Sequence, residues 1–330
     1  MLMNLYLFCF VLFITSLIIT YIVMRWAISR SVLDLPNERS SHSTPTPRGG
    51  GIAIAITWFL TIIYLFFRRE LDAQLFWALL CGIPIFAIGL IDDIITISPK
   101  VRFVVQIVSA AIAVFLLGGL KSIDIGYRTL SVPYLFSLIA IIGVVWFTNL
   151  FNFLDGIDGY ISSEVIFIGF AIFFLFGDLA PAFLAIITAG FLVWNWQPAK
   201  IFMGDVGSTL LGFTIGVFAI YYQNTGESSI FIWLMLTSLF WFDATLTLCR
   251  RWRNGEKLSQ AHRKHVYQRI VQAGFSHQKT VVYGIMINFF ILLLVIIAIK
   301  YPKLLLVMLL VNVMVLYYIV RLVDKRFQFK

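Results

Sequence analysis

Residues 133–176 read PYLFSLIAIIGVVWFTNLFNFLDGIDGYISSEVIFIGFAIFFLF, two apolar runs joined by a short polar segment. Each run is about as long as the roughly 17 to 25 apolar residues that a helix needs to cross a membrane. The polar segment, NLFNFLDGIDG, holds two asparagines and two aspartates at three-residue intervals. The stretch therefore predicts two membrane-spanning helices with a cluster of acids and amides between them.

The composition extends this pattern to the whole chain of 330 residues. Hydrophobic residues make up 61%, charged residues 12%, and the mean hydropathy is +0.94, whereas soluble globular chains carry about 25% charged residues. We therefore predict an all-α, polytopic membrane protein with one integral membrane domain over residues 1–330. Cys9, Cys81 and Cys249 lie too far apart to indicate a disulfide framework or a metal site.

Eleven apolar runs are candidate membrane-spanning helices, and Gly177, Asp178 and Pro181 mark a turn that divides residues 160–197 into two of them. The N-terminal run has no positively charged leader and exceeds the core of a signal peptide, so we expect it to be retained as the first span. The predicted spans are 4–24, 50–67, 75–91, 101–118, 133–149, 160–176, 180–197, 207–222, 229–248, 281–299 and 303–321.

Lys and Arg residues are divided unequally between the two predicted sides of the membrane. With the N-terminus outside, 19 of the 25 Lys and Arg residues fall in or beside the inner loops and the C-terminal tail. Short cytoplasmic loops carry the Lys and Arg excess, so we expect the N-terminus outside and the C-terminus in the cytoplasm. The net charge of +9 would then face anionic membrane lipids, and no motif indicates a nucleic-acid partner.

The polar clusters all fall in predicted inner loops. Asp92 and Asp93 end the third span, and two adjacent acids repel each other unless a cation neutralises them or one is protonated. Acids at membrane depth usually serve a site. Lys100 and Arg102 follow and could hold phosphate charge. A solvated helix end with snorkelling cations is the alternative explanation.

The segment 149–158 offers amides and carboxylates that could converge on one pocket if the chain turns at its glycines. Asn149 and Asn152 supply donors and acceptors, whereas Asp155 and Asp158 supply acceptors only. This mixture suits ribose hydroxyls, a base edge or a hydrated metal, and a plain polar loop is the alternative.

Residues 202–208, FMGDVGS, follow the seventh span. The two glycines allow a ligand to approach the backbone closely. Ser208 could cap the next helix, whose N-terminus would favour a phosphate. Asp205 is the best single candidate for a metal ligand, and an ordinary turn is the alternative.

The loop 261–269, AHRKHVYQR, places His262 and His265 three residues apart, as on one face of a helix. A zinc site would need a third histidine or a cysteine, and Mg²⁺ prefers oxygen ligands. We therefore interpret these histidines, together with Arg263, as donors to a pyrophosphate or sugar. A basic amphipathic helix on the membrane surface is the alternative.

Four further polar residues lie outside these motifs. His42 and Arg48 lie in a loop rich in proline and glycine, which is either shaped for a ligand or an ordinary connection. We expect Asp243, near the inner end of the ninth span, to be a partner of the basic loop 261–269, and an acid that serves a transporter is the alternative. His277 stands alone and is expected in a surface loop.

Acids for Mg²⁺, cations for diphosphate and a lipid-facing position together suggest phosphoryl transfer to a lipid phosphate. The ordered motifs IDDIITISPK, NLFNFLDGIDG, FMGDVGSTLLGF and HRKH resemble the polyprenyl-phosphate N-acetylhexosamine-1-phosphate transferases over nearly the whole chain. The loops PNERSSHSTPTPRGGG and HRKHVYQR are similar to the branch that starts O-antigen and related polysaccharides. They depart from the denser histidine pattern of the peptidoglycan enzyme.

The resemblance implies that undecaprenyl phosphate attacks a UDP-N-acetylhexosamine to give the sugar-diphosphate lipid and UMP. It also implies a bacterial inner membrane location, an active-site cleft on the cytoplasmic face, and Mg²⁺ as the metal, with Mn²⁺ as a substitute. A homodimer is a further expectation. The donor stays open among N-acetylglucosamine, N-acetylgalactosamine, N-acetylfucosamine and N-acetylquinovosamine.

Roles follow from motif positions. Asp205 resembles the family's magnesium ligand, and Phe202 the aromatic residue that stacks on uracil. Asp92, with Asp93 beside it, resembles the residue proposed to deprotonate or orient the lipid phosphate. The expected substrate-binding residues are Asn149, Asn152 (also a metal ligand), Asp155, Asp158, His262, Arg263, His265, Lys100, His42 and Arg48.

Two rival functions predict other patterns. A secondary transporter would place its acids near the midplane of broken helices, whereas the acids here cluster at one face. A CDP-alcohol phosphotransferase would carry a DG-x₂-AR core, but Asp155-Gly156 is followed by Ile-Asp-Gly-Tyr.

Overall fold

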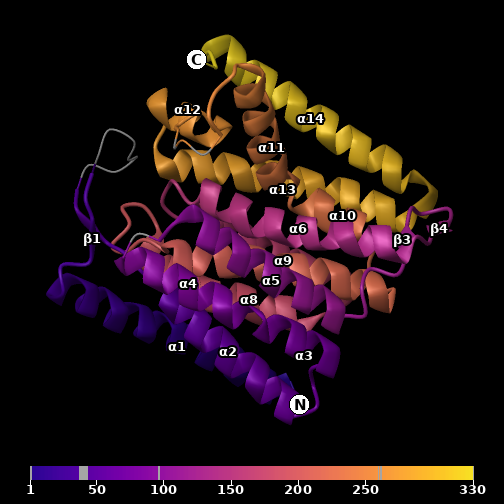
Figure 1. Cartoon of the computed structure of the whole chain (residues 1–330), viewed down its shortest axis with the longest axis horizontal. Coiled ribbons are helices and arrows are strands. Elements are labelled where there is room, and N and C mark those ends of the chain that lie inside the picture. The colour runs from indigo at the N-terminus through magenta and orange to yellow at the C-terminus, as the bar shows by residue number, and fades with distance from the viewer. Residues whose placement is uncertain (1, 37–43, 96, 259, 261, 330) are drawn as a thin grey trace.

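A computed structural model describes residues 2–36, 44–95, 97–258, 260 and 262–329 (Figure 1). About three quarters of these residues are helical and very few are in strands, which confirms the predicted all-α membrane fold. The elements are α1 (Leu2–Ser29), β1 (Leu33–Asp34), β2 (Thr46–Pro47), α2 (Gly51–Phe67), α3 (Ala73–Leu80), α4 (Gly82–Ile94), α5 (Pro99–Leu116), β3 (Ile123–Asp124), β4 (Thr129–Leu130), α6 (Pro133–Leu154), α7 (Tyr160–Phe176), α8 (Leu179–Asn195), α9 (Asp205–Thr225), α10 (Ile230–Leu236), α11 (Ser238–Arg253), α12 (Val266–Gln272), α13 (His277–Lys300), η1 (Pro302–Leu304) and α14 (Leu305–Arg326).

The number of helices that can cross a membrane differs from the prediction. Seven described helices are long and apolar enough, or eight if the α10–α11 pair, bent by 78°, counts as one broken span. The other three of the eleven predicted spans coincide with α2, α7 and α8, which have 17 residues each. At about 1.5 Å per residue such a helix measures about 26 Å, slightly less than the roughly 30 Å of a hydrocarbon core.

Helix α9 forms the centre of the bundle. Of its most apolar window 94% is buried, whereas the other long helices bury 22–39% of theirs. Small residues permit this packing. A Cβ atom at Gly212 would lie 2.4 Å from the carbonyl oxygen of Phe147 in α6, and one at Gly89 in α4 would lie 2.8 Å from the Cα of Val206. Helix α9 is thus the rigid axis that carries Asp205 at its first residue.

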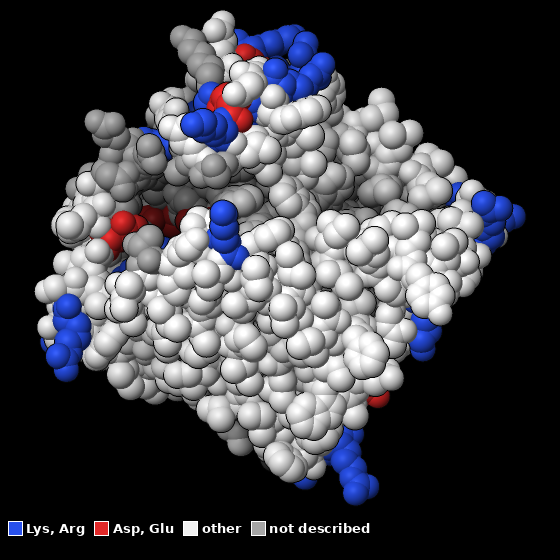
Figure 2. Space-filling model, in the orientation of Figure 1, with Lys and Arg blue, Asp and Glu red and all other residues white. Residues whose placement is uncertain are grey.

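The outer surface of the bundle is apolar. Figure 2 shows a broad uncharged face between groups of charged side chains at the edges of the molecule. Large side chains such as Phe115, Tyr134 and Phe174 are 80%, 94% and 73% exposed. Apolar exposure on this scale marks a membrane surface.

Short antiparallel hairpins lie at opposite edges of the bundle. The β1–β2 hairpin, α12 and the C-terminus lie along one edge, and the β3–β4 hairpin lies at the other (Figure 1). The C-terminal end of α4 and the N-terminal end of α9 belong to the first edge, so the loops predicted to carry polar clusters gather there.

Candidate active site

Three aspartates and two arginines form an ion-pair cluster at the N-terminus of α9. Asp92 and Asp93 come from the last turn of α4, Asp205 begins α9, Arg48 follows β2, and Arg102 lies in the first turn of α5. The three aspartate side chains are 10%, 2% and 13% exposed. Three carboxylates against two guanidinium groups leave an excess of one negative charge, so the cluster can accept a further cation.

Asp205 joins the two arginines. Its Oδ1 accepts a hydrogen bond from Arg48 Nη2 at 2.9 Å, and its Oδ2 accepts one from Arg102 Nη1 at 2.5 Å. Arg102 also donates to Asp92 Oδ2 at 2.6 Å, and Arg48 Nε lies 3.0 Å from Asp93 Oδ1. Each arginine therefore bridges one aspartate of α4 to Asp205 of α9.

Asp93 caps α9. Its carboxylate accepts hydrogen bonds from the backbone N–H groups of Asp205 at 3.0 Å and Val206 at 3.2 Å. These are N–H groups that a helix N-terminus leaves without intrahelical partners. Gly204 is required beside them, because its φ is +78° and a Cβ atom there would lie 2.4 Å from Asp93 Oδ2. Asp93 thus fixes the position of Asp205.

The loop after β2 is held against the segment before α9. Phe202 N–H donates to Pro47 O at 2.8 Å, and Gly50 N–H donates to Phe202 O at 2.9 Å. A Cβ atom at Gly51 would lie 2.3 Å from the Cα of Gly207, so only glycine allows this approach. This contact places Arg48 and Phe202 together at the site. His42, in the same loop, lies outside the described residues.

The polar segment 149–158, which comprises the last turns of α6 and the residues that follow, reaches the site at two points. Asn152 Nδ2 donates to Ser208 Oγ at 3.3 Å, one turn beyond Asp205. Burial and the negative charge of Asp205 raise the pKa of Asp155 to about 8. Asn149 turns toward α5 instead, where Nδ2 donates to Gln106 Oε1 at 2.7 Å.

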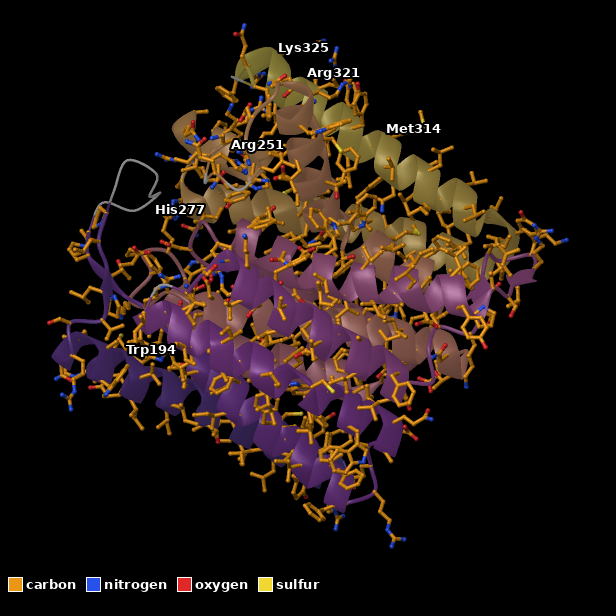
Figure 3. The ribbon with its side chains drawn as sticks, viewed as in Figure 1. Trp194, Arg251, His277, Met314, Arg321 and Lys325 are labelled. Atoms are coloured by element: carbon orange, nitrogen blue, oxygen red, sulfur yellow. The ribbon has the colours of Figure 1, made fainter. Side chains whose placement is uncertain are left out.

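Asp158 holds three segments together. Its Oδ2 accepts a hydrogen bond from Ala199 N–H at 3.1 Å and lies 3.3 Å from Nδ1 of His277, the first residue of α13 (Figure 3). The expectation that His277 lies in a surface loop is wrong, since the residue is only 7% exposed. The reason is tertiary: the turn between α6 and α7 packs against this histidine, and the backbone N–H of Asp158 donates to its Nδ1 at 3.3 Å.

The basic loop is ordered by Asp243, as expected. Both carboxylate oxygens of Asp243 accept from Val266 N–H, at 2.9 and 3.0 Å, and Oδ1 lies 3.5 Å from His265 Nδ1. His265 is the N-cap of α12, so His262 precedes the helix instead of sharing its face. Their rings nevertheless lie side by side, with centroids 4.9 Å apart.

Tyr267 connects the basic loop to the polar segment at the C-terminal end of α6. Its hydroxyl donates to Phe153 O at 3.2 Å, and a Cβ atom at Gly156 would lie 2.2 Å from that hydroxyl oxygen. Gly156 is therefore needed for close packing against the tyrosine. The connection ties the loop that carries Arg263 to the wall that carries Asp155.

Arg102, not Lys100, supplies the charge next to the aspartates. Lys100 is exposed, and no described carboxylate forms an ion pair with it. Helix α5 begins at Pro99, so Arg102 and Gln106 are four residues apart on one face and point the same way. The sequence alone did not distinguish Arg102 from Lys100, because the aspartates that pair with Arg102 come from α4 and α9. Ser208, Gln106 and Tyr267 are contacts that only the fold reveals.

The donor set of the cluster is compatible with Mg²⁺. Among the described residues no group of three or more His, Cys, Asp and Glu side chains is arranged to hold a metal. Mg²⁺ does not need such a group, since it usually binds one or two carboxylates together with substrate phosphates and water. Asp205, the first residue of α9, and Asn152 of α6, whose amide contacts Ser208 one turn further along α9, both offer oxygen ligands.

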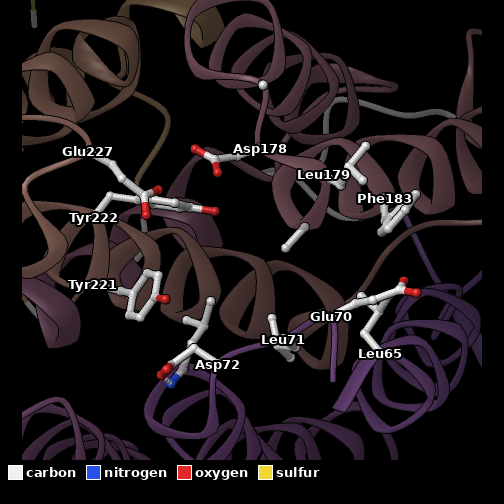
Figure 4. A pocket seen from close by; sticks show the side chains of 13 residues that line it. Leu65, Glu70, Leu71, Asp72, Asp178, Leu179, Phe183, Tyr221, Tyr222 and Glu227 are labelled. Atoms are coloured by element: carbon white, nitrogen blue, oxygen red, sulfur yellow. Dashed lines mark hydrogen bonds between the residues drawn. The ribbon is translucent and has the colours of Figure 1, made fainter. Parts of the chain in front are cut away.

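A separate acidic cavity lies at the other end of α9. Tyr221 and Tyr222 line it together with Asp178 and Glu227, and its volume is about 240 Å³ (Figure 4). Burial and the nearby charge of Glu227 raise the pKa of Asp178 to about 6. The length of α9 separates this cavity from Asp205, so the cavity is not part of the candidate active site.

Comparison with known proteins identifies the family. The model of Glycosyl transferase family 4 matches residues 75–223. The chain is 31% identical over 297 residues to a probable undecaprenyl-phosphate N-acetylglucosaminyl 1-phosphate transferase of Bacillus subtilis. The aligned residues cover 84% of this chain and 80% of the relative. It is 29% identical to an undecaprenyl-phosphate alpha-N-acetylglucosaminyl 1-phosphate transferase of Thermotoga maritima, over 78% of this chain and 79% of the relative. It is also 29% identical to a decaprenyl-phosphate N-acetylglucosaminephosphotransferase of Mycobacterium tuberculosis, over 81% of this chain and 77% of the relative.

The chain therefore belongs to glycosyl transferase family 4, the polyprenyl-phosphate N-acetylhexosamine-1-phosphate transferases that its motifs resemble. The matched residues 75–223 contain Asp92, Asp93 and Asp205. Arg48 and the basic loop lie outside this range, and only the fold brings them to the same edge of the molecule.

Proposed function

We propose that this protein transfers an N-acetylhexosamine-1-phosphate from a UDP-sugar to undecaprenyl phosphate. The products are UMP and the first lipid-linked intermediate of a cell-surface polysaccharide, such as O-antigen of lipopolysaccharide or a related glycan. The observation that carries the proposal is the cluster of Asp92, Asp93, Asp205, Arg48 and Arg102 at the N-terminus of α9. It combines acids, phosphate-binding cations and the positive end of a helix dipole at one place.

The reaction needs negative charge to be stabilised on three phosphates. An oxygen of the lipid phosphate attacks the phosphorus that carries the sugar, and the bond from that phosphorus to the oxygen of UMP breaks. Arg48 and Arg102 are the nearest cations for this charge, and exchanging their aspartate partners for phosphate oxygens would leave their hydrogen bonds satisfied. Asp92, at the edge of the cluster, would orient the lipid phosphate.

Mg²⁺, or Mn²⁺ in its place, would be held by Asp205 and Asn152. When bound, it supplies positive charge to the diphosphate that is cleaved. The negative excess of the cluster and its oxygen donors support this assignment.

The nucleotide and sugar would contact the surrounding walls. Phe202 supplies an aromatic face for uracil beside Arg48. His262, Arg263 and His265 supply donors for the diphosphate or sugar from the other side. Asn149 and Asp158, whose side chains are engaged with neighbouring elements, would act by holding these walls in place.

The names of the relatives favour UDP-N-acetylglucosamine as the donor to test first, since each includes N-acetylglucosamine. We further propose an inner-membrane location with the N-terminus outside and the C-terminus in the cytoplasm. The excess of Lys and Arg at the edge that contains the cluster supports this orientation. A homodimer belongs to the same proposal.

The test is UMP release by the purified protein. The protein is incubated with Mg²⁺ and each of several UDP-N-acetylhexosamines, with and without undecaprenyl phosphate. UMP that depends on both lipid and metal supports the proposal and identifies the sugar. UMP formed without the lipid would mean hydrolysis and would refute the acceptor. No UMP from any donor, with folded protein, would refute the transferase assignment.

A further inference from the structure

Helix α14 presents a continuous apolar stripe to its surroundings. Val307, Leu310, Met314, Tyr317 and Tyr318 are 48%, 59%, 62%, 47% and 64% exposed. The first four recur at intervals of three and four residues and Tyr318 follows Met314 by four, which places all five on one face of a helix. The opposite face packs into the protein through other side chains. The stripe is therefore a surface for lipid acyl chains.

The stripe ends in two cations on the same face. Arg321 follows Tyr317 by four residues, and Lys325 follows Arg321 by four more, so the interval of three to four residues continues without a break. Met314, Arg321 and Lys325 lie along the outer edge of α14 in Figure 3. From Val307 to Arg321 the helix rises about 21 Å, which is most of the depth of one hydrocarbon core. The side chains thus change from apolar to cationic where a membrane surface is expected.

A cavity opens beside these cations. It has a volume of about 520 Å³ and lies between the end of α11, the end of α14 and the C-terminal tail, with Arg250, Arg253, Arg321, Asp324 and Phe329 in its lining. Figure 2 shows the blue side chains of this corner of the molecule gathered together.

The carboxylate in the cavity is already neutralised. Arg250 donates to both oxygens of Asp324, at 3.1 and 2.8 Å, and Arg269 Nη2 lies 2.8 Å from Oδ1. Among the described residues, by contrast, no carboxylate forms an ion pair with Arg253 or Arg321, and both side chains are exposed. Two guanidinium groups therefore remain to bind an anion from outside the protein.

We propose that this corner binds the head group of an anionic membrane phospholipid. Its phosphate would lie between Arg253 and Arg321, and its acyl chains would lie along the stripe of α14. Guanidinium groups suit a phosphate because their N–H donors match its oxygens. The apolar stripe that leads into the cavity identifies the source of the phosphate as a lipid and not a soluble ion.

This site is distinct from the candidate active site. It is built from α11, α14 and the tail, and none of the residues that hold the proposed phosphate belongs to the cluster around Asp205. The inference rests on the membrane character of the chain and stands whether or not the proposed transfer reaction is confirmed.

The test compares lipids that differ only in head group. The purified full-length protein in detergent is titrated with phosphatidylglycerol or phosphatidylcholine of identical acyl chains, and bound lipid is counted by native mass spectrometry. The double variant Arg253→Gln/Arg321→Gln is compared with a matched control, Arg128→Gln/Lys303→Gln, which removes two exposed cations at the opposite edge. Glycerol 3-phosphate and undecaprenyl phosphate are added as competitors in separate arms.

We expect the wild type and the control pair to bind phosphatidylglycerol in preference to phosphatidylcholine. Loss of two cations near an anionic head group should weaken that binding about 25-fold, with the thermal midpoint unchanged, and Arg321→Gln alone should give a smaller loss in the same direction. An unchanged preference in the double variant would overturn the proposal. So would displacement by glycerol 3-phosphate, which would indicate a site for soluble phosphates, or preferential displacement by undecaprenyl phosphate, which would make the cavity a substrate site.

Discussion

Asp205 is held by arginines that are 157 and 103 residues away in the chain. Replacing it by asparagine keeps the size and removes the charge that both arginines share. We expect Asp205→Asn to lower lipid-dependent UMP release by about 100-fold or more, because a charged group at the reacting phosphates is lost. The cluster would change from one excess negative charge to none, so the thermal midpoint should stay near that of the wild type.

Glu70→Gln is the control for this substitution, since Glu70 is an exposed acid outside the cluster whose nearest cation, Arg68, is 3.6 Å away. It should leave UMP release unchanged. A large drop in the thermal midpoint of Asp205→Asn, with UMP release reduced only in proportion to the folded fraction, would instead make Asp205 a structural residue.

His262 predicts a dependence of stability on pH. Burial, followed by the neighbouring His265 and Arg251, lowers its pKa from 6.5 to about 4. Between these values the folded protein binds fewer protons than the unfolded chain, so its free energy of unfolding falls as the pH falls from 6.5 toward 4. The thermal midpoint of His262→Gln, measured over this range, should decline less than that of the wild type. If the thermal midpoints of the variant and the wild type declined in parallel, the lowered pKa of His262 would not be the cause of the loss of stability.

The junction between α4 and α9 depends on one glycine. Gly204 has φ +78°, and a side chain there would meet the Asp93 carboxylate that caps α9. We expect Gly204→Ala to destabilise the protein by about 1–3 kcal/mol and to lower UMP release as well, because the cap positions Asp205. Chemical unfolding in detergent and the UMP assay would measure the two effects.

A substitution at Gly226, at the other end of α9, separates the cost of the left-handed backbone from the effect of displacing Asp93. The φ of Gly226 is +79°, but nothing lies within 4 Å of the position of a Cβ atom. Gly226→Ala should therefore show only the cost of the left-handed backbone and keep full UMP release. Equal loss of activity in both variants would mean that general weakening of α9, and not displacement of Asp93, is responsible.

A buried polar pair joins α7 to α13. Asn288 Nδ2 donates to Glu164 Oε2 at 2.5 Å, and the two residues are 1% and 2% exposed. Asn288→Leu would leave the acid without this donor and should lower stability by about 1–2 kcal/mol. The double variant Glu164→Leu/Asn288→Leu should lose less than the single one, since no polar group is then stranded. If instead the two losses simply add, the pair contributes nothing specific to the fold.

At the scale of the whole molecule, the prediction was best where the signal is local. Runs of apolar residues located the long helices of the bundle, because length and hydrophobicity are read one segment at a time, whereas the short α12 lies outside every predicted run. The prediction of eleven full spans exceeded the seven or eight that meet the length requirement, since a run of 17 residues does not reveal how deeply a helix is inserted. Asp205 and Arg48 were selected as candidates from loops next to these runs, and Asp243 from its position inside the ninth run.

Pairing between segments could not be derived in the same way. The choice of Arg102 over Lys100, the burial of His277 beside Asp158, and the position of His265 at the start of α12 depend on which elements meet. The sequence by itself determined a helical membrane protein with its polar chemistry in a few loops at one edge. The tertiary structure alone decided which charges pair, because the ion pairs of the site join residues that are up to 157 positions apart, a separation over which no sequence periodicity acts.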